Sequence, residues 1–125
     1  MTVTTTRFPE VKNYIGGKFV GGIKKSIDVL SPLDGTIIST VPLSAIEDLN
    51  DAVEAAQKAF QTWSAMPVKE RVQIFFRYKT LLEKNLQELA TLVREENGKT
   101  IDEAIAEVEK SIELTEFACS MPQLI

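Results

Sequence analysis

Cys119 is the side chain in this sequence with the clearest capacity for covalent chemistry, because a thiolate is a strong nucleophile. It lies near the end of a predicted helix, where the negative end of the helix dipole disfavours a thiolate. The sequence contains no histidine, so neither a Cys-His nor a Ser-His dyad can form within the chain. A single cysteine also excludes an intrachain disulfide and a zinc site built on several cysteines. We therefore predict a small packed thiol, and we expect a cytoplasmic location, or the mitochondrial matrix if the source is eukaryotic.

Three glycine-containing runs are candidates for phosphate or anion binding. Gly16-Gly17 and Gly21-Gly22 could cradle a phosphate, and Asn97-Gly98-Lys99 could hold an anion at the start of the helix that follows. Neither glycine pair joins a strand to a helix or has the spacing of a dinucleotide fingerprint, so both are predicted to be turns. A linker between two helices explains Asn97-Gly98-Lys99 without a ligand, and the anion site is the less favoured alternative.

Acidic and aromatic side chains provide two further candidates. Glutamates in the second half of the chain could bind a cation, and Phe75-Phe76-Arg77-Tyr78 could stack nucleotide bases. The spacing of the last three glutamates is typical of a solvated helix face, and helical periodicity indicates core packing for the aromatic run. The glutamates are Glu95, Glu96, Glu107, Glu109, Glu113 and Glu116. We predict no catalytic, cofactor-binding or metal-binding residue in this chain.

Charge and hydropathy limit the possible partners. The net charge of −4 argues against nucleic acid and anionic membrane surfaces. No stretch reaches the run of about 18 apolar residues that a membrane-spanning helix needs. Residues 1–12 are polar, lack the apolar segment of a secretory signal, and are predicted to be a flexible lead-in.

Residues 13–43 are predicted to form β-hairpins. Gly16-Gly17 can supply positive φ at both positions of a tight turn. Pro32-Leu33-Asp34-Gly35 has the composition of a second turn, and Pro42 ends the strand that returns from it. The strands are recognised by alternation of polar and apolar residues or by β-branched composition. They are residues 13–15, 18–20, 26–31 and 36–41.

Residues 44–125 are predicted to form four amphipathic helices, because the hydrophobic period changes from two to about 3.6 residues. Three begin with a capping residue and a glutamate three positions later, namely Ser44–Glu47, Asn85–Glu88 and Thr100–Glu103. Pro67 opens the second helix at its first position, Gly98 ends the third, and Pro122 stops the fourth. The predicted inner faces contain Ile46, Leu49, Val53, Ala56, Phe60 and Trp63; Val68, Val72, Phe75, Phe76, Lys79 and Leu82; Leu86, Leu89, Ala90 and Val93; and Ile101, Ala104, Ile105, Val108, Ile112 and Thr115. The predicted fold class is α+β.

Five motifs, in order along residues 13–125, resemble the N-terminal part of the aldehyde dehydrogenase superfamily. They are Tyr14-Ile15-Gly16-Gly17-Lys18-Phe19, Ser31-Pro32-Leu33-Asp34-Gly35, the alanines from Ala52 to Ala59 with Phe60 and Trp63, Pro67-Val68-Lys69-Glu70-Arg71, and Asn97-Gly98-Lys99 followed by Asp102-Glu103-Ala104 and Glu107-Val108. Ser31 stands where the family has Asn. Ala106 stands where the family usually has Gly, and this second departure affects how closely the helix packs on its neighbour rather than catalysis. The resemblance implies the outer part of a cofactor-binding domain, and therefore one incomplete domain.

Two stretches narrow the resemblance to the CoA-acylating methylmalonate-semialdehyde dehydrogenase branch, whose members oxidise malonate and methylmalonate semialdehydes with NAD to acyl-CoA products. They are Arg77–Leu82 and Glu116–Cys119 followed by Pro122-Gln123-Leu124. In that family the nucleophilic cysteine, the glutamate base and the segments that bind NAD and CoA come later in the sequence, and Cys119 is not the nucleophile. The resemblance thus implies a scaffold segment that is inactive alone, with NAD and the co-substrate CoA bound by the full-length protein.

A stand-alone, self-associating helical interaction module is the alternative hypothesis. Helices shaped to cover an absent sheet would leave a large apolar patch exposed. Association of copies would bury that patch, so we expect a homo-oligomer formed through exposed apolar helix faces.

Overall fold

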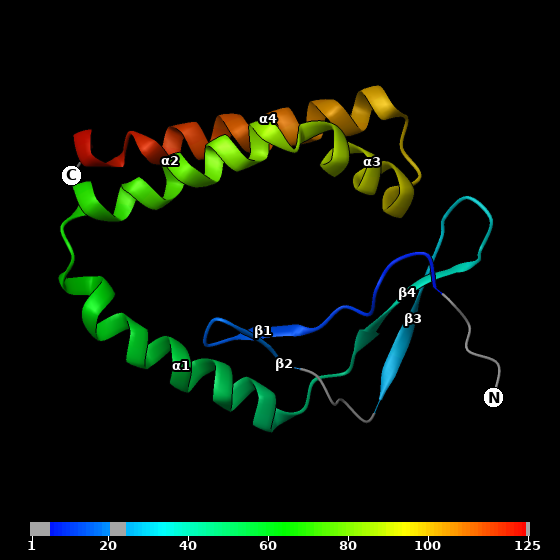
Figure 1. The fold of residues 1–125 in the computed structure, drawn as a ribbon, viewed down its shortest axis with the longest axis horizontal. Helices are drawn as coiled ribbons and strands as arrows, with labels where there is room; N and C mark the ends of the chain where they lie inside the picture. Colours follow the sequence, from blue (N-terminus) through cyan, green and yellow to red (C-terminus); the bar gives the residue numbers. More distant parts are fainter. Residues whose placement is uncertain (1–5, 21–24, 125) are drawn as a thin grey trace. The chain divides into compact units, whose positions relative to one another are not determined.

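The computed structural model describes residues 6–20 and 25–124, so the predicted turn at Gly21-Gly22 lies outside the described residues. Short antiparallel strands are followed by four α-helices, which confirms the predicted α+β class (Figure 1). The chain forms two compact units that divide between Thr62 and Trp63, inside the first helix. Within the described part of the chain, no helix combines the length and apolar character needed to cross a membrane.

The N-terminal unit is built on two antiparallel hairpins. The strands are β1 (Asn13–Ile15), β2 (Lys18–Val20), β3 (Ser26–Leu30) and β4 (Ile37–Pro42), and β1 pairs with β2 and β3 with β4. Gly16 and Gly17 have φ angles of 58° and 79°, which confirms the predicted two-glycine turn. Pro42 pairs with Ser26 as the last residue of β4, where a missing N–H is tolerated.

The predicted flexible lead-in is attached to β4 over residues 8–11. The Phe8 N–H donates to the Ile38 carbonyl at 2.8 Å, and the Val11 N–H donates to the Thr40 carbonyl at 2.9 Å. The Ser39 hydroxyl donates to the Pro9 carbonyl at 2.7 Å. These bonds satisfy polar groups along an edge that a two-stranded sheet would leave open. Residues 8–11 therefore run along β4, while residues 1–5 lie outside the described residues.

The first helix, α1 (Ile46–Ala65), begins with a different cap from the one predicted. Ser44 and Asn13 exchange side-chain hydrogen bonds of 2.8 and 3.2 Å. Asp48 accepts the Ala45 N–H at 2.8 Å, which is the role predicted for Glu47 but shifted by one residue. The predicted Ser44–Glu47 capping box is wrong, because a partner 31 residues away in the sequence engages the Ser44 hydroxyl.

The C-terminal unit packs three helices around a small core. They are α2 (Val68–Lys84), α3 (Leu86–Asn97) and α4 (Ile101–Cys119), followed by the short 3-10 helix η1 (Met121–Gln123). After α3, the chain turns back and α4 runs alongside both α2 and α3 (Figure 1). Ala90 and Ala104 are 0% exposed and Val108 is 6% exposed, and they form one buried cluster. The residues packed around it, Leu86, Leu89, Val93, Ile101, Ile105 and Ile112, confirm the predicted inner faces of α3 and α4.

Two helix starts differ from the predictions. Pro67 lies at the N-cap of α2 with ψ 143°, one position before its predicted place. Asn85 lies at the N-cap of α3, but its side-chain amide donates to the Leu81 carbonyl at 2.7 Å. The predicted Asn85–Glu88 capping box is therefore wrong, because Asn85 is the one residue between α2 and α3 and its side-chain amide bonds a carbonyl in the last turn of α2. At the other end, α4 stops at Cys119 and Pro122 lies in η1.

The close packing of α3 on α4 predicts a cost for enlarging Ala104. Ala104→Leu adds three carbons at a position with no exposed surface, so we expect the free energy of unfolding to fall by about 1–3 kcal/mol. Ala106→Leu is the matched control, since Ala106 is exposed on the same helix, and we expect a change within about 0.5 kcal/mol. Urea unfolding followed by circular dichroism measures both, and equal losses would contradict the assigned core.

Candidate functional site

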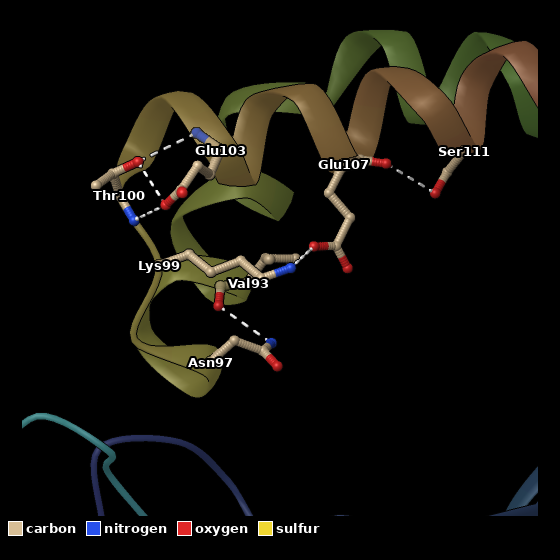
Figure 2. Close-up of polar contacts among 7 residues, drawn as sticks. All are labelled: Val93, Asn97, Lys99, Thr100, Glu103, Glu107 and Ser111. Atoms are coloured by element: carbon tan, nitrogen blue, oxygen red, sulfur yellow. Dashed lines mark hydrogen bonds and ion pairs between the residues drawn. The ribbon is translucent and has the colours of Figure 1, made fainter.

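The junction between α3 and α4 contains the largest group of candidate residues (Figure 2). Gly98 ends α3 with a φ of 70°, and its N–H donates to the Arg94 carbonyl at 2.8 Å. Thr100 then begins α4, with its hydroxyl oxygen accepting the Glu103 N–H at 3.3 Å. The Glu103 carboxylate accepts the Thr100 N–H at 2.9 Å, so the predicted helix stop and the Thr100–Glu103 capping box are both confirmed.

Glu103 carries the negative charge at the start of α4. The backbone N–H and then the hydroxyl of Thr100, together with the nearby Lys99 ammonium, hold the pKa of Glu103 below its ordinary value of 4.5. The carboxylate also faces the positive end of the α4 dipole, which favours its charged form. Glu103 thus takes the position in which an external anion would bind at this helix N-terminus.

The other polar side chains of the junction have partners within the chain. Lys99 forms an ion pair with Glu107, which lies further along α4 (Figure 2). The Asn97 side-chain amide donates to the Val93 carbonyl at 3.2 Å. The Lys99 and Asn97 side chains are therefore engaged by residues of the chain itself, and the geometry favours a connector between helices over a binding site.

Three of the six glutamates predicted as a possible cation site pair with lysines, namely Glu107, Glu113 and Glu116, and Glu95 lies 3.8 Å from Arg94. Lys79 Nζ lies 3.2 Å from Glu116 on α4 and 3.4 Å from Glu83 on α2. The hydrogen bond to Glu116, ahead of that to Glu83, raises the pKa of Lys79 above its ordinary value. Lys110 pairs with Glu113 at 2.7 Å. Among residues 6–20 and 25–124, no group of three His, Cys, Asp or Glu could hold a metal ion.

Two other candidates have structural roles. Cys119 is the last residue of α4 and is buried, as predicted for a packed thiol. Gly16 and Gly17 lie in the turn from β1 to β2, and no helix begins at this turn to point its N-terminus at a phosphate. Gly16-Gly17 therefore lacks the geometry of a loop that binds a dinucleotide.

The aromatic run on α2 is less buried than predicted. Phe75, Phe76 and Tyr78 are 40%, 48% and 51% exposed, whereas Val72 and Leu82 on the same helix are buried. The prediction of core packing is wrong for these aromatic side chains, because α4 covers only one strip of α2. Their exposure leaves apolar surface on the C-terminal unit.

The C-terminal unit has an apolar groove that was not predicted from any motif. It has a volume of about 300 Å³ and is lined by Trp63, Val68, Arg71, Val72, Phe75, Ala118 and Met121. Arg71 also lines the groove, and its Nε is buried with no acceptor among the described residues within hydrogen-bond distance. The spacing of Val68, Arg71, Val72 and Phe75 could have revealed this feature, because it places a cation on the apolar face of a helix.

Comparison with known proteins identifies the family. The family described as the aldehyde dehydrogenase family matches residues 19–125. This chain belongs to the aldehyde dehydrogenase family. Among its relatives, malonate-semialdehyde dehydrogenase 2 of Oceanobacillus iheyensis is 44% identical over 126 residues, which cover 100% of this chain and 26% of that protein. The chain therefore spans about a quarter of the length of this relative.

Solved structures match the fold of the chain as well. The methylmalonate-semialdehyde dehydrogenase from Oceanimonas doudoroffii has a TM-score of 0.89 and 34% identity, over 94% of this chain and 24% of that one. A Sinorhizobium meliloti protein, described as a methylmalonate-semialdehyde dehydrogenase and complexed with NAD, has a TM-score of 0.88 and 32% identity over 97% of this chain and 24% of that one. The predicted family, and the predicted likeness to its N-terminal part, are confirmed.

The lowered pKa of Glu103 predicts an acid-dependent contribution to stability. Because the folded-state pKa lies below 4.5, the stabilisation is fully present above that value and is lost as the pH falls through the folded-state pKa. We expect Glu103→Gln to lower the Tm at about pH 6 and to have a smaller effect at about pH 3. Thermal denaturation of both proteins at each pH measures this. The control is Glu109→Gln, which is exposed on the same helix and should show less pH dependence; a Glu103→Gln effect that grows on acidification would contradict the prediction.

Proposed function

We propose that this chain is the N-terminal scaffold segment of an NAD-dependent aldehyde dehydrogenase that oxidises malonate or methylmalonate semialdehyde to an acyl-CoA product. The observation that carries the proposal is the 44% identity to a malonate-semialdehyde dehydrogenase over the whole of this chain. The structural neighbour complexed with NAD supports NAD as the cofactor. The motifs at Arg77–Leu82 and Glu116–Cys119, which resemble the CoA-acylating branch, support CoA as the co-substrate.

In this proposal the chain contributes to the fold of the enzyme and supplies no residue that reacts with the aldehyde or binds NAD or CoA. The buried Cys119 thiol, the capping box of Thr100 and Glu103, and the Lys99–Glu107 pair all serve the packing of helices. We infer that the residues that bind NAD and CoA and that attack the aldehyde belong to parts of the fold outside this chain. We also infer a cytoplasmic location, which suits a lone thiol that forms no disulfide within the chain.

A chimeric enzyme tests the proposed function. This chain replaces the 126 matched residues at the corresponding position of the Oceanobacillus iheyensis dehydrogenase. We expect the chimera to form NADH from malonate semialdehyde in a CoA-dependent reaction, with kcat/KM within about ten-fold of the parent enzyme, since the scaffold makes no contact with the reacting atoms. The isolated 125-residue chain should form no NADH.

The parent enzyme without its matched segment is the control for the chimera. It should lose activity, because a segment of this size contributes to the folded core. NADH formation by the isolated chain, or a chimera that folds but does not oxidise the aldehyde, would contradict the proposed function.

A second candidate function, self-association as a helical module, is favoured by one exposed face of α4. Leu114 and Phe117 are 62% and 64% exposed, and because they lie three residues apart they share a side of the helix. Apolar side chains of this size on one face are typical of a surface that another protein covers. We propose that copies of the isolated chain associate through this face.

Substitution on the exposed face tests the second candidate. Phe117→Lys places a charge where two copies would meet, so we expect the dimer dissociation constant to rise by at least about ten-fold. Ala106→Lys is the matched control, since it adds the same charge at an exposed position on the same helix. Light scattering over a range of concentrations measures both, and a monomer at every concentration would contradict the candidate.

A further inference from the structure

The connector between α3 and α4 contains the one asparagine of this sequence that is followed by glycine. The asparagines are Asn13, Asn50, Asn85 and Asn97, and the residues after them are tyrosine, aspartate, leucine and glycine. Glycine has no Cβ, so its backbone nitrogen can reach the side-chain carbon of the preceding asparagine without steric hindrance. Asn97-Gly98 is therefore the pair in this chain with the chemistry for spontaneous deamidation.

The reaction consumes water and needs no other reagent. The Gly98 backbone nitrogen loses its proton and forms a bond to Asn97 Cγ, and the bond from Cγ to Nδ2 breaks as ammonia leaves. Water then opens the cyclic imide on either side of the shared nitrogen. Opening at Cγ gives aspartate, and opening at the main-chain carbonyl gives isoaspartate, in which the chain runs through Cγ. The net change is the replacement of an amide NH2 by OH.

The folded connector keeps both reacting groups in hydrogen bonds. Asn97 is the last residue of α3, and its side-chain amide donates to the Val93 carbonyl at 3.2 Å (Figure 2). The Gly98 N–H donates to the Arg94 carbonyl at 2.8 Å, so the proton that must leave is engaged. Helical φ and ψ at Asn97 also hold the following peptide plane in a different orientation from that of a five-membered imide ring. Deamidation therefore requires the last turn of α3 to open.

This turn is placed where opening is local. Asn97, Gly98 and Lys99 are all exposed, so water reaches the reacting atoms as soon as the hydrogen bonds break. Helix ends open with a free energy well below that of global unfolding. The rate of the reaction in the folded chain is therefore controlled by the connector and not by unfolding of the buried cluster.

We propose that Asn97-Gly98 is a site of spontaneous covalent modification whose rate is set by opening of the last turn of α3. Conversion adds a negative charge at the negative end of the α3 dipole and removes the donor to the Val93 carbonyl. Isoaspartate also adds a carbon to the main chain where α3 gives way to α4. The modified chain loses stability in the helix pair that buries Ala90 and Ala104. The reaction is independent of the proposed function, because it involves no substrate or cofactor.

Peptide mass spectrometry after incubation in mildly alkaline buffer tests the proposal. We expect Asn97 to convert at least about ten-fold faster in denaturing urea than in native buffer, because urea removes both protecting hydrogen bonds. Asn13, Asn50 and Asn85 are internal controls, and each should convert about ten-fold more slowly than Asn97 in urea, or slower still. The chimeric enzyme is measured beside the isolated chain, and circular dichroism shows which samples have folded helices.

Thr100→Ala tests whether the connector sets the rate. It removes the side-chain cap that fixes the start of α4, so we expect Asn97 to convert about three-fold faster or more in native buffer and at the same rate in urea. Thr91→Ala is the matched control, because it removes the same atoms from an exposed position on α3. Its rate in native buffer should stay within about two-fold of the unsubstituted chain.

Two substitutions at the site test the effect on stability. Asn97→Asp reproduces the charge of the product, so we expect the Tm at neutral pH to fall by about 3 °C or more. Asn97→Gln keeps an amide but places it one methylene further from the backbone, where the imide ring would have six members and forms more slowly. It should abolish the conversion at position 97 and change the Tm by less than about 2 °C.

Three results would overturn the proposal. Equal conversion of Asn97 in urea and in a sample with folded helices would mean that the fold does not control the rate. Conversion of Asn97 in urea at the rate of the other three asparagines would mean that Gly98 confers no reactivity. A Tm that Asn97→Asp leaves unchanged would mean that the modification has no effect on the helix pair.

Discussion

Ala90 on α3 and Ala104 on α4 have no exposed surface and meet in one buried cluster, and the C-terminal unit is organised around this contact. Alanine has no side chain beyond Cβ, so two helices can approach closely at these positions and bury the larger apolar residues on either side. The approach also depends on the connector, because Gly98 reverses the chain at a positive φ and Thr100 starts α4 immediately afterwards. α4 then continues alongside α2, which it contacts through the pairing of Glu116 with Lys79.

The helices have more apolar surface than they can cover among themselves. Val72 and Leu82 are buried, but Phe75 and Phe76 beside them remain substantially exposed, and so do Leu114 and Phe117 on α4. Burial of apolar area is the main favourable term in folding, so surfaces of this kind are normally completed by other parts of a protein or by a partner. In the same region Arg71 Nε is buried, and no acceptor among the described residues lies within hydrogen-bond distance of it.

Several charged groups of the α3–α4 junction have their partners within the chain. Glu103 neutralises the positive end of α4, and Lys99 and Glu107 neutralise each other. Side chains paired in this way fix the geometry of a connector and have little capacity left for a ligand. For a member of the aldehyde dehydrogenase family that spans a quarter of the length of its relatives, such a role agrees with the proposed division between scaffold and chemistry.

The sequence by itself determined several features that depend only on near neighbours in the chain, although it did not reveal that Asn85 bonds the Leu81 carbonyl four residues before it. The two-glycine turn at Gly16-Gly17, the stop at Gly98, the Thr100–Glu103 capping box and the buried faces of α3 and α4 follow from φ preferences, short-range hydrogen bonds and helical periodicity. Tertiary structure decided every case in which a distant group competed for the same atoms or surface. Ser44 bonds Asn13 instead of capping α1, residues 8–11 bond β4, Phe75 remains 40% exposed, and Arg71 Nε is buried without an acceptor among the described residues. Periodicity shows which face of a helix is apolar, but what covers that face depends on contacts between residues far apart in the chain.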